Sequence, residues 1–417
     1  MRSALRGLAI DVTPLKTSRD FRLLWVGQLV SLTGRQVTVV ALPYQVFLLT
    51  HSNLDVGLIG IAQLLPLIVF GIAGGPLVDR VDRRRVILAT EVGMAAASAL
   101  LLGGAVEGHP SLLFLYAVAG LQAGLSGINS PARSASTANL VPKEQLPAAF
   151  ALGQVLFNTT LIVGPSMAGV ILARFGLTWA YGIDVLTFLG SITATVMLRP
   201  LPPQREEGSE AATGWRAVRE GFAYLRGRRV LVSTFAIDLG AMVFGMPRAL
   251  FPALALNTFH VGPQGLGLLY AAPAFGALVG ALGSGWVGRV RHQGRAVIWA
   301  VALWGAAIAA FGLSRSFFWP ALGFLSIAGA ADVVSAVFRS TILQVSVPDA
   351  LRGRISAVHI MVVTGGPRLG DFEAGAVATA FTPAISVVSG GLASIAGALL
   401  VAAVIPELAR YHAGEGV

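Results

Sequence analysis

Twelve stretches of the sequence are long and apolar enough to cross a lipid bilayer, and they limit the possible folds more than any other feature. A membrane helix needs about 20 mostly apolar residues. Only 12% of the 417 residues are charged, roughly half of the ~25% typical of soluble domains. We therefore expect an all-α membrane protein. The expected spans are 21–48, 55–78, 86–106, 111–136, 146–173, 177–198, 230–256, 264–288, 296–314, 317–345, 355–380 and 384–405.

A long polar segment, residues 199–229, separates the first six stretches from the last six. We expect an N-terminal six-helix bundle over 1–198, a linker over 199–229 and a C-terminal six-helix bundle over 230–417. The linker should contain an amphipathic helix that lies on anionic lipid, tethers the two halves, or does both. Its apolar residues at helical spacing are Trp215, Val218, Phe222 and Leu225.

The basic residues of the connecting segments gather on one side of the expected membrane. The turns on the other side carry only Arg174 and Arg315. Lys and Arg are enriched in cytoplasmic loops, so both termini and the linker should be cytoplasmic, in the cell (inner) membrane. The net charge of +10 follows from this topology, and nucleic acid is not an expected partner. The first twenty residues lack an apolar core, so no cleavable signal peptide is expected.

The sequence lacks the residues that several classes of protein need for their function. Cysteine is absent, which excludes thiolate metal sites, disulfides and Cys nucleophiles. The sequence contains no hydrolase triad, metal-ligand cluster or phosphate-binding glycine loop. We expect neither an enzyme nor an ATP-driven pump within this chain, and no metal or cofactor. A membrane receptor or scaffold would need a large signalling loop or tail, which this sequence lacks, whereas an uptake carrier stays open because span count does not fix direction.

The two halves contain matching segments. RSASTANLVP ends the fourth stretch and RSTILQVSVP ends the tenth, which makes Arg133 and Arg339 equivalent. Gly-Pro pairs, ending at Pro165 and Pro367, occur in the fifth and eleventh stretches. Internal repeats of this kind are typical of transporters, whose substrate site lies where the repeats meet. Both arginines lie near the expected cytoplasmic ends, where they could snorkel to the interface or pair with Asp79.

The segment GGPLVDRVDRRR, residues 74–85, lies between the second and third stretches. It resembles the loop signature of the major facilitator superfamily, except that Asp82 stands where the family usually has Gly. The resemblance implies twelve helices in two pseudo-symmetric six-helix bundles. It also implies that the loop closes the cytoplasmic side in one of two alternating states. The residues that match this gating motif are Gly75, Asp79, Arg80, Arg83 and Arg84.

Four further segments resemble the branch of this superfamily that exports enterobactin. They are PLKTSRDFRLLW, LPYQVFLLTHSNLDVGL, FPALALNTFHVGPQGLGLLYAAPAFGALVGALGSG and GRISAV. The resemblance implies export of catecholate siderophores across the bacterial inner membrane, driven by the proton gradient without a cofactor. Broad-specificity multidrug efflux is the alternative, because that branch borders multidrug exporters. Ala119 stands where many proton-coupled drug exporters have Arg, and Arg289 stands where an Asp would mirror Asp79, so the coupling mechanism does not transfer directly.

Charged residues inside the apolar stretches point to a central cavity, because a charge facing lipid at mid-depth costs at least about 2.5 kcal/mol. Arg368 and Asp371 are three residues apart and share one helix face. We expect them to form a charge pair that faces the cavity, or a structural ion pair that locks this span to a neighbour. In the first case Asp371 takes part in proton coupling and Arg368 binds the cargo.

The expected cavity is rich in arginine, which suits an anionic or polyphenolic small molecule. A guanidinium group donates to paired oxygens and stacks on aromatic rings. The other expected partners are membrane lipids, and the expected oligomeric state is a monomer. The residues expected to line the substrate cavity are Gln28, Ser31, Arg35, Thr38, Arg248 and Arg368. The candidates for proton coupling are Asp371, Asp238, Asp184 and Asp332.

Overall fold

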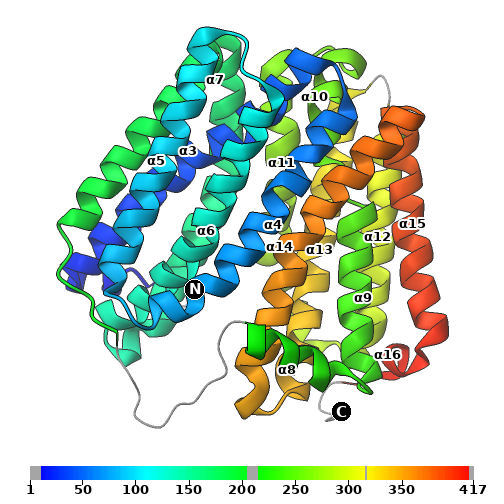
Figure 1. Cartoon of the computed structure of the whole chain (residues 1–417). Helices are drawn as coiled ribbons and strands as arrows, with labels where there is room; N and C mark the ends of the chain where they lie inside the picture. Colours follow the sequence, from blue (N-terminus) through cyan, green and yellow to red (C-terminus); the bar gives the residue numbers. More distant parts are fainter. Residues whose placement is uncertain (1–10, 204–214, 315–316, 413–417) are drawn as a thin grey trace, which may run out of the picture.

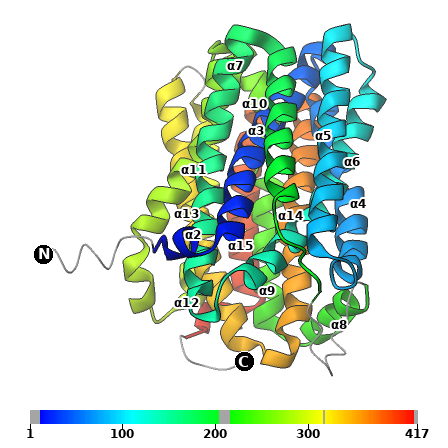
Figure 2. The same cartoon turned by 90° about the vertical axis from the view of Figure 1, so that its left-hand side faces the viewer.

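The computed structural model describes residues 11–203, 215–314 and 317–412. All regular elements in these ranges are helices, and they form two groups that lie side by side (Figure 1). Figure 2 shows that the long helices run along one common direction. The first group contains α2 (Thr13–Thr17), α3 (Arg19–Thr50), α4 (Asn53–Val78), α5 (Arg83–Glu107), α6 (Leu112–Leu140), η1 (Lys143–Gln145) and α7 (Leu146–Val196).

The second group follows the linker helix α8 (Trp215–Leu225). It begins with α9 (Arg229–Phe244), η2 (Arg248–Leu250), α10 (Phe251–Ala253) and η3 (Leu254–Thr258). It continues with α11 (Gly262–Leu282), η4 (Ser284–Arg289), α12 (Gln293–Leu313), α13 (Phe318–Ser346), α14 (Asp349–Ala380), α15 (Pro383–Val404) and α16 (Pro406–Arg410).

The helices of the described ranges agree with the twelve predicted spans. Nine helical segments there are long and apolar enough to cross a membrane. One of them contains α7, whose 51 residues are interrupted at Gly176, where φ is 78°. This left-handed conformation suits glycine, and it divides α7 into two consecutive crossings. The helices α3 and α14 are not among the nine, but with 32 residues each they are long enough to span a bilayer.

The seventh predicted span, 230–256, is broken instead of continuous. Helix α9 ends at Phe244, and a new helical segment starts at Arg248. Pro247 lies in the gap, and the Trp304 indole donates to the carbonyl of Gly245 at 3.1 Å. Helix α9 ends before Pro247, which has no backbone N–H to donate. The side chain of a neighbouring helix satisfies the carbonyl of Gly245, the residue at the end of α9. The break places Arg248 at the start of a new segment inside the bundle.

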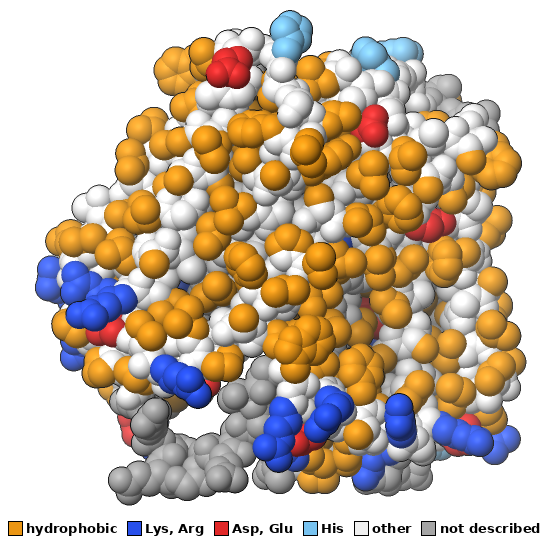
Figure 3. Space-filling view, viewed as in Figure 1, with side chains coloured by type: hydrophobic (Ala, Val, Ile, Leu, Met, Phe, Trp, Pro, Cys, Tyr) orange, Lys and Arg blue, Asp and Glu red, His pale blue; other side chains and the backbone are white. Residues whose placement is uncertain are grey.

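The surface divides into an apolar flank and a basic end. Figure 3 shows hydrophobic side chains across the middle of the face drawn, with Lys and Arg gathered at one end. We call the end where α4 leads into α5 and α6 leads into α7 the basic end (Figure 1). Large apolar side chains on the flank include Leu65, which is 69% exposed, and Trp299, which is 71% exposed. The structure therefore presents a multi-pass membrane protein with a lipid-facing surface.

The two halves meet closely at the end opposite the basic end. Helix α4 packs on α14 there, and α7 packs on α11. A Cβ atom on Gly60 would lie 2.4 Å from the carbonyl oxygen of Arg368, and one on Gly267 would lie 2.4 Å from that of Pro165. Only glycine permits backbones to approach this closely. These two helix pairs form the contact that we call the seal.

The linker helix α8 packs on the second half instead of lying free. Its Val218 and Leu225 are buried, whereas Trp215 and Phe222 are exposed. Glu220 forms an ion pair at 2.8 Å with Arg354 of α14. Of the four apolar residues that predicted the amphipathic helix, two therefore pack on the protein and two face its surroundings.

Candidate functional site

A cavity of about 330 Å³ lies between the two halves. Helices α3, α4, α6 and α7 line one side, and η2, α11 and α14 line the other. This arrangement suits a small-molecule site, because ligand pockets of about 300–1,000 Å³ occur where domains meet. We call it the central cavity. Its charged lining residues are Arg35, Arg248, Arg368 and Asp371.

The three arginines reach the central cavity from three different elements. Arg35 lies on α3, Arg248 starts η2 after the break in the seventh span, and Arg368 follows Pro367 in α14. The side chains of Arg35 and Arg248 have no hydrogen bond or ion pair within the described residues. Each guanidinium group carries five donors, so both groups are free to bind a ligand.

The predicted charge pair between Arg368 and Asp371 is wrong. The guanidinium group of Arg368 donates to the carbonyl of Thr364 at 2.5 Å, and its Nε is buried without a partner. One carboxylate oxygen of Asp371 accepts from the backbone N–H of Ala249 at 3.1 Å. The two residues do share the face that lines the central cavity. They form no direct ion pair, although the charge of each acts on the other.

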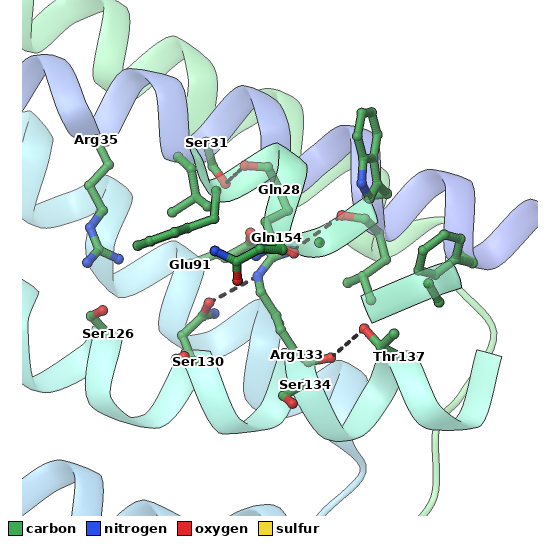
Figure 4. Close-up of a pocket in the computed structure, with 18 of the residues that line it drawn as sticks. Gln28, Ser31, Arg35, Glu91, Ser126, Ser130, Arg133, Ser134, Thr137 and Gln154 are labelled. Atoms are coloured by element: carbon green, nitrogen blue, oxygen red, sulfur yellow. Dashed lines mark hydrogen bonds and ion pairs between the residues drawn. The ribbon is translucent and has the colours of Figure 1, made fainter. Parts of the chain in front are cut away.

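A second cavity of about 330 Å³ lies within the first group of helices (Figure 4). Arg35 and Phe157 line both cavities, so the two spaces meet at these residues. Helix α6 presents serines to the second cavity at every fourth position, which is one helix face. We call this space the side pocket. Its polar lining residues include Gln28, Ser31, Arg35, Glu91, Ser126, Asn129, Ser130, Arg133, Ser134, Thr137 and Gln154.

The six predicted cavity residues therefore divide between the two spaces. Arg35, Thr38, Arg248 and Arg368 line the central cavity. Gln28 and Ser31 line the side pocket, two turns and one turn along α3 from Arg35, respectively. Their roles in binding stay predictions.

Glu91 of α5 is the main site residue that the sequence analysis missed. Its side chain is 1% exposed and forms an ion pair with Arg133. The same carboxylate accepts from Ser191 and, at 2.8 Å, from Thr195. A single Glu inside the apolar run LATEVGMAAAS was the available signal, since a charge in such a run needs a partner. Arg133 thus pairs inside the bundle, and the expectation that it snorkels or pairs with Asp79 is wrong.

Arg339, the counterpart of Arg133, also pairs inside its own half. It forms an ion pair with Asp238, and its other terminal nitrogen lies 3.6 Å from Asp332. Arg339 is 7% exposed, so it does not snorkel. Two of the four coupling candidates are therefore members of one cluster that an arginine holds.

Asp184, another coupling candidate, is completely buried on α7. One carboxylate oxygen accepts from Thr38 at 2.6 Å and from Ser98 at 2.7 Å. Gln122 of α6 in turn donates to Ser98 at 3.0 Å. Both Thr38 and Gln122 also line the central cavity.

The loop motif makes its side-chain contacts with the first half and with the start of the linker. Asp82 caps α5 by accepting from the N–H of Arg84 at 2.9 Å and also accepts from the N–H of Leu201 at 3.2 Å. Arg84 donates to the carbonyl of Val196 at 2.5 Å, at the end of α7. Asp79 is exposed and has no side-chain partner in the described part of the chain. Asp82, which departs from the family pattern, thus caps α5.

The remaining motif residues have separate places. Arg83 is buried and donates to the carbonyl of Ala135 at 3.2 Å. Arg80 is exposed. Gly75 has open space around its Cα, since a Cβ atom at this position would have no neighbour within 4 Å among the described residues. Close helix approach therefore does not explain Gly75 in this conformation.

Comparison with known proteins identifies one family, relatives that are similar in sequence, and solved structures that are similar in fold. The family model described as transmembrane secretion effector matches residues 10–413. The enterobactin exporter EntS of Citrobacter koseri is 28% identical over 410 residues, which are 97% of this chain and 96% of that protein. The enterobactin exporter EntS of Shigella boydii gives the same identity and the same coverage.

Solved structures share the fold at lower identity. The nucleoside transporter NupG has a TM-score of 0.70 and 14% identity, covering 94% of this chain and 100% of its own. A bacterial homologue of the iron transporter ferroportin in an inward-facing state has a TM-score of 0.67 and 15% identity, covering 94% and 98%. A bacterial homologue of the human lysosomal transporter Spinster, inward-facing and unoccupied, has a TM-score of 0.69 and 16% identity, covering 94% and 96%.

Proposed function

Because this chain belongs to the transmembrane secretion effector family of the major facilitator superfamily, we propose that it exports a siderophore-like catecholate across the inner membrane. Transport proceeds by alternating access and is driven by the proton gradient. The relatives named as enterobactin exporters, matched over 97% of this chain, support the substrate class.

The observation that carries the substrate class is the set of arginines in the central cavity. Arg35, Arg248 and Arg368 line one space, and none of them has a carboxylate within 4 Å among the residues that the structure describes. A catecholate presents pairs of adjacent phenolic oxygens on an aromatic ring. Guanidinium groups match both features, since they donate two parallel hydrogen bonds and stack on rings.

The seal and the loop motif support alternating access. Helices α4 and α14 pack together at one end, as do α7 and α11. At the basic end, the hydrogen bonds of Asp82, Arg83 and Arg84 described above stay within the first half and the start of the linker. We infer that this conformation opens toward the basic end, and that this end faces the cytoplasm because Lys and Arg favour that side. Cargo then enters the central cavity from the cytoplasm.

Binding by variants of the purified chain tests the substrate class. Arg248→Gln removes one charged donor group, and a hydrogen bond to a charged group contributes about 1.5–3 kcal/mol. We expect the Kd for a tris-catecholate to rise by about tenfold or more. Arg174→Gln is the matched control, since Arg174 is exposed in a turn at the opposite end from the basic end. Equal affinities of the two variants would overturn the assignment of the arginines to the cargo.

Broad multidrug efflux is the second candidate, supported by Asp371, the one carboxylate among the described residues that lines the central cavity. A cationic drug would bind through that carboxylate and be repelled by the three arginines. If the chain exports cationic dyes and does not bind tris-catecholates, multidrug efflux replaces the siderophore proposal. Binding of catecholates without binding of dyes supports the siderophore proposal.

A further inference from the structure

Asp184 differs from the other buried acidic residues of the two bundles. Glu91 is paired with Arg133, and Asp238 is paired with Arg339. Asp184 is 0% exposed and has no ion pair within the described ranges. Its Oδ1 atom is buried and has no hydrogen-bond partner there. A buried, ionised carboxylate with an unpartnered oxygen carries a large desolvation cost, and binding a proton at that oxygen removes the charge.

A chain of hydrogen bonds links Asp184 to the central cavity on two sides. Thr38 donates directly to its Oδ2 at 2.6 Å, and Thr38 lines the cavity. Ser98 donates to the same oxygen at 2.7 Å and accepts from Gln122 at 3.0 Å. Gln122 also lines the cavity. The carboxylate is therefore buried, but it is only one or two hydrogen bonds away from the cargo space.

The surroundings of Asp184 contain few other titratable groups. Arg35 approaches from α3, one turn before Thr38, and its charge acts on Asp184. Tyr181 lies on the same helix, and its hydroxyl donates to Gln45 at 2.6 Å. Helix α5 contributes the uncharged Ser98, and α6 contributes the uncharged Gln122 through it. No charged side chain other than Arg35 competes for the carboxylate in the described part of its neighbourhood.

We propose that Asp184 takes up and releases the proton that drives export, and that its protonation changes the hydrogen bonds that the cavity wall offers to the cargo. This inference rests on the proposed function. A proton from water on the outer side forms an O–H bond at Oδ1 and leaves a neutral acid. The same bond breaks when the proton leaves to water on the cytoplasmic side, and the carboxylate is restored.

Protonation of Asp184 changes the hydrogen-bond roles in the cavity wall. An ionised Asp184 only accepts, so Thr38 and Ser98 both turn their hydrogens toward its Oδ2. The oxygen of Thr38 then keeps a lone pair for a phenolic hydroxyl group of the cargo. A neutral Asp184 accepts more weakly at Oδ2 than a carboxylate does, so Thr38 can turn its hydrogen toward the cavity. The wall then presents a donor where it presented a lone pair, and the cargo meets different hydrogen bonds in the two protonation states.

Two transport assays on the full chain in proteoliposomes test this inference. Asp184→Asn should abolish the stimulation of tris-catecholate transport by an imposed pH gradient, while substrate counterflow without a gradient persists. Glu144→Gln, an exposed loop carboxylate, is the matched control and should keep the full stimulation. Full stimulation of Asp184→Asn would overturn the inference, as would loss of stimulation in Asp371→Asn alone. Wild-type chain that moves no catecholate would contradict the proposed function instead.

A spectroscopic measurement tests Asp184 without any cargo. The pH-difference infrared spectrum of the wild-type chain in lipid should contain the C=O band of a buried carboxylic acid. That band should be lost in Asp184→Asn and shifted in Asp184→Glu. Should Asp184→Asn fail to fold, Thr38→Val, which removes one of the two hydroxyl donors to Oδ2, should still shift the band. A band that is unchanged in all three variants would show that Asp184 does not exchange a proton.

Discussion

At the residue scale, the buried arginines divide into a paired group and an unpaired group. Arg133 and Arg339 each hold a carboxylate inside one half. The arginines of the central cavity have no such partner among the described residues. An unpaired buried charge is costly. We therefore infer that the paired arginines stabilise the bundles and propose that the unpaired arginines bind the cargo.

Loss of the Glu91 carboxylate should destabilise the first bundle. Glu91→Gln leaves Arg133 buried without an anion, and breaking one partner of a buried pair costs about 3–5 kcal/mol. We expect a clearly lower midpoint of thermal unfolding in detergent, measured by near-ultraviolet circular dichroism. Glu144→Gln is the exposed control and should unfold like the wild type. An unchanged midpoint for Glu91→Gln would show that the pair contributes nothing to stability.

The sequence predicts the charged residues of the central cavity well, for a physical reason. A charge in an apolar stretch must avoid lipid, so Arg35, Arg248 and Arg368 could only face inward. It does not predict their partners, because side-chain directions depend on neighbouring helices. Asp371 lies one turn from Arg368, yet the N–H of Ala249, freed near the break in the seventh span, binds its carboxylate. Glu91 was missed although, like Asp184, it is a single acidic residue inside an apolar stretch.

At the scale of elements, the seal depends on glycines that face another backbone. Gly60 of α4 meets the carbonyl of Arg368, on the helix that carries two cavity charges.

The spans were predicted from hydropathy, and most were confirmed to within a few residues. The break after Phe244 was not predicted, because Gly and Pro are common in membrane helices that stay continuous.

A bulky side chain in the seal should keep that end open. In Gly60→Leu, even the Cβ would lie 2.4 Å from the Arg368 carbonyl, so α4 and α14 must separate. The chain has no cysteine, so a single Gln63→Cys in the central cavity reports access. We expect an impermeant thiol reagent to reach it from the end opposite the basic end in Gly60→Leu. Gly103→Leu, where a Cβ has open space, is the control, and equal labelling of both would refute this account of the seal.

The loop motif should matter for transport and not for folding. Asp79 is exposed and has no partner in the described part of the chain, so Asp79→Asn should leave the unfolding midpoint unchanged. We expect a large loss of export rate, because its partners meet it only when the basic end closes. Efflux from proteoliposomes measures the rate. A normal rate in well-folded Asp79→Asn would remove Asp79 from the gate.

At the scale of the whole molecule, we propose that one cavity between the two halves closes at either end in turn. The orientation of the chain is testable with single cysteines, because the chain has none of its own. Lys143→Cys lies at the basic end and should react only with reagent supplied from the cytoplasm. Arg174→Cys lies in the turn at the other end and should react only from outside. The reverse pattern would invert the proposed direction of access.

Metabolite analysis of a strain that lacks this chain tests the central claim most directly. The strain grows without added iron, and mass spectrometry measures catecholates in the spent medium and in the cells. Export by this chain predicts that catecholates fall in the medium and rise in the cells. Wild-type chain should restore the medium level, whereas the Arg248→Gln chain should not. Unchanged catecholates in both compartments would contradict the account.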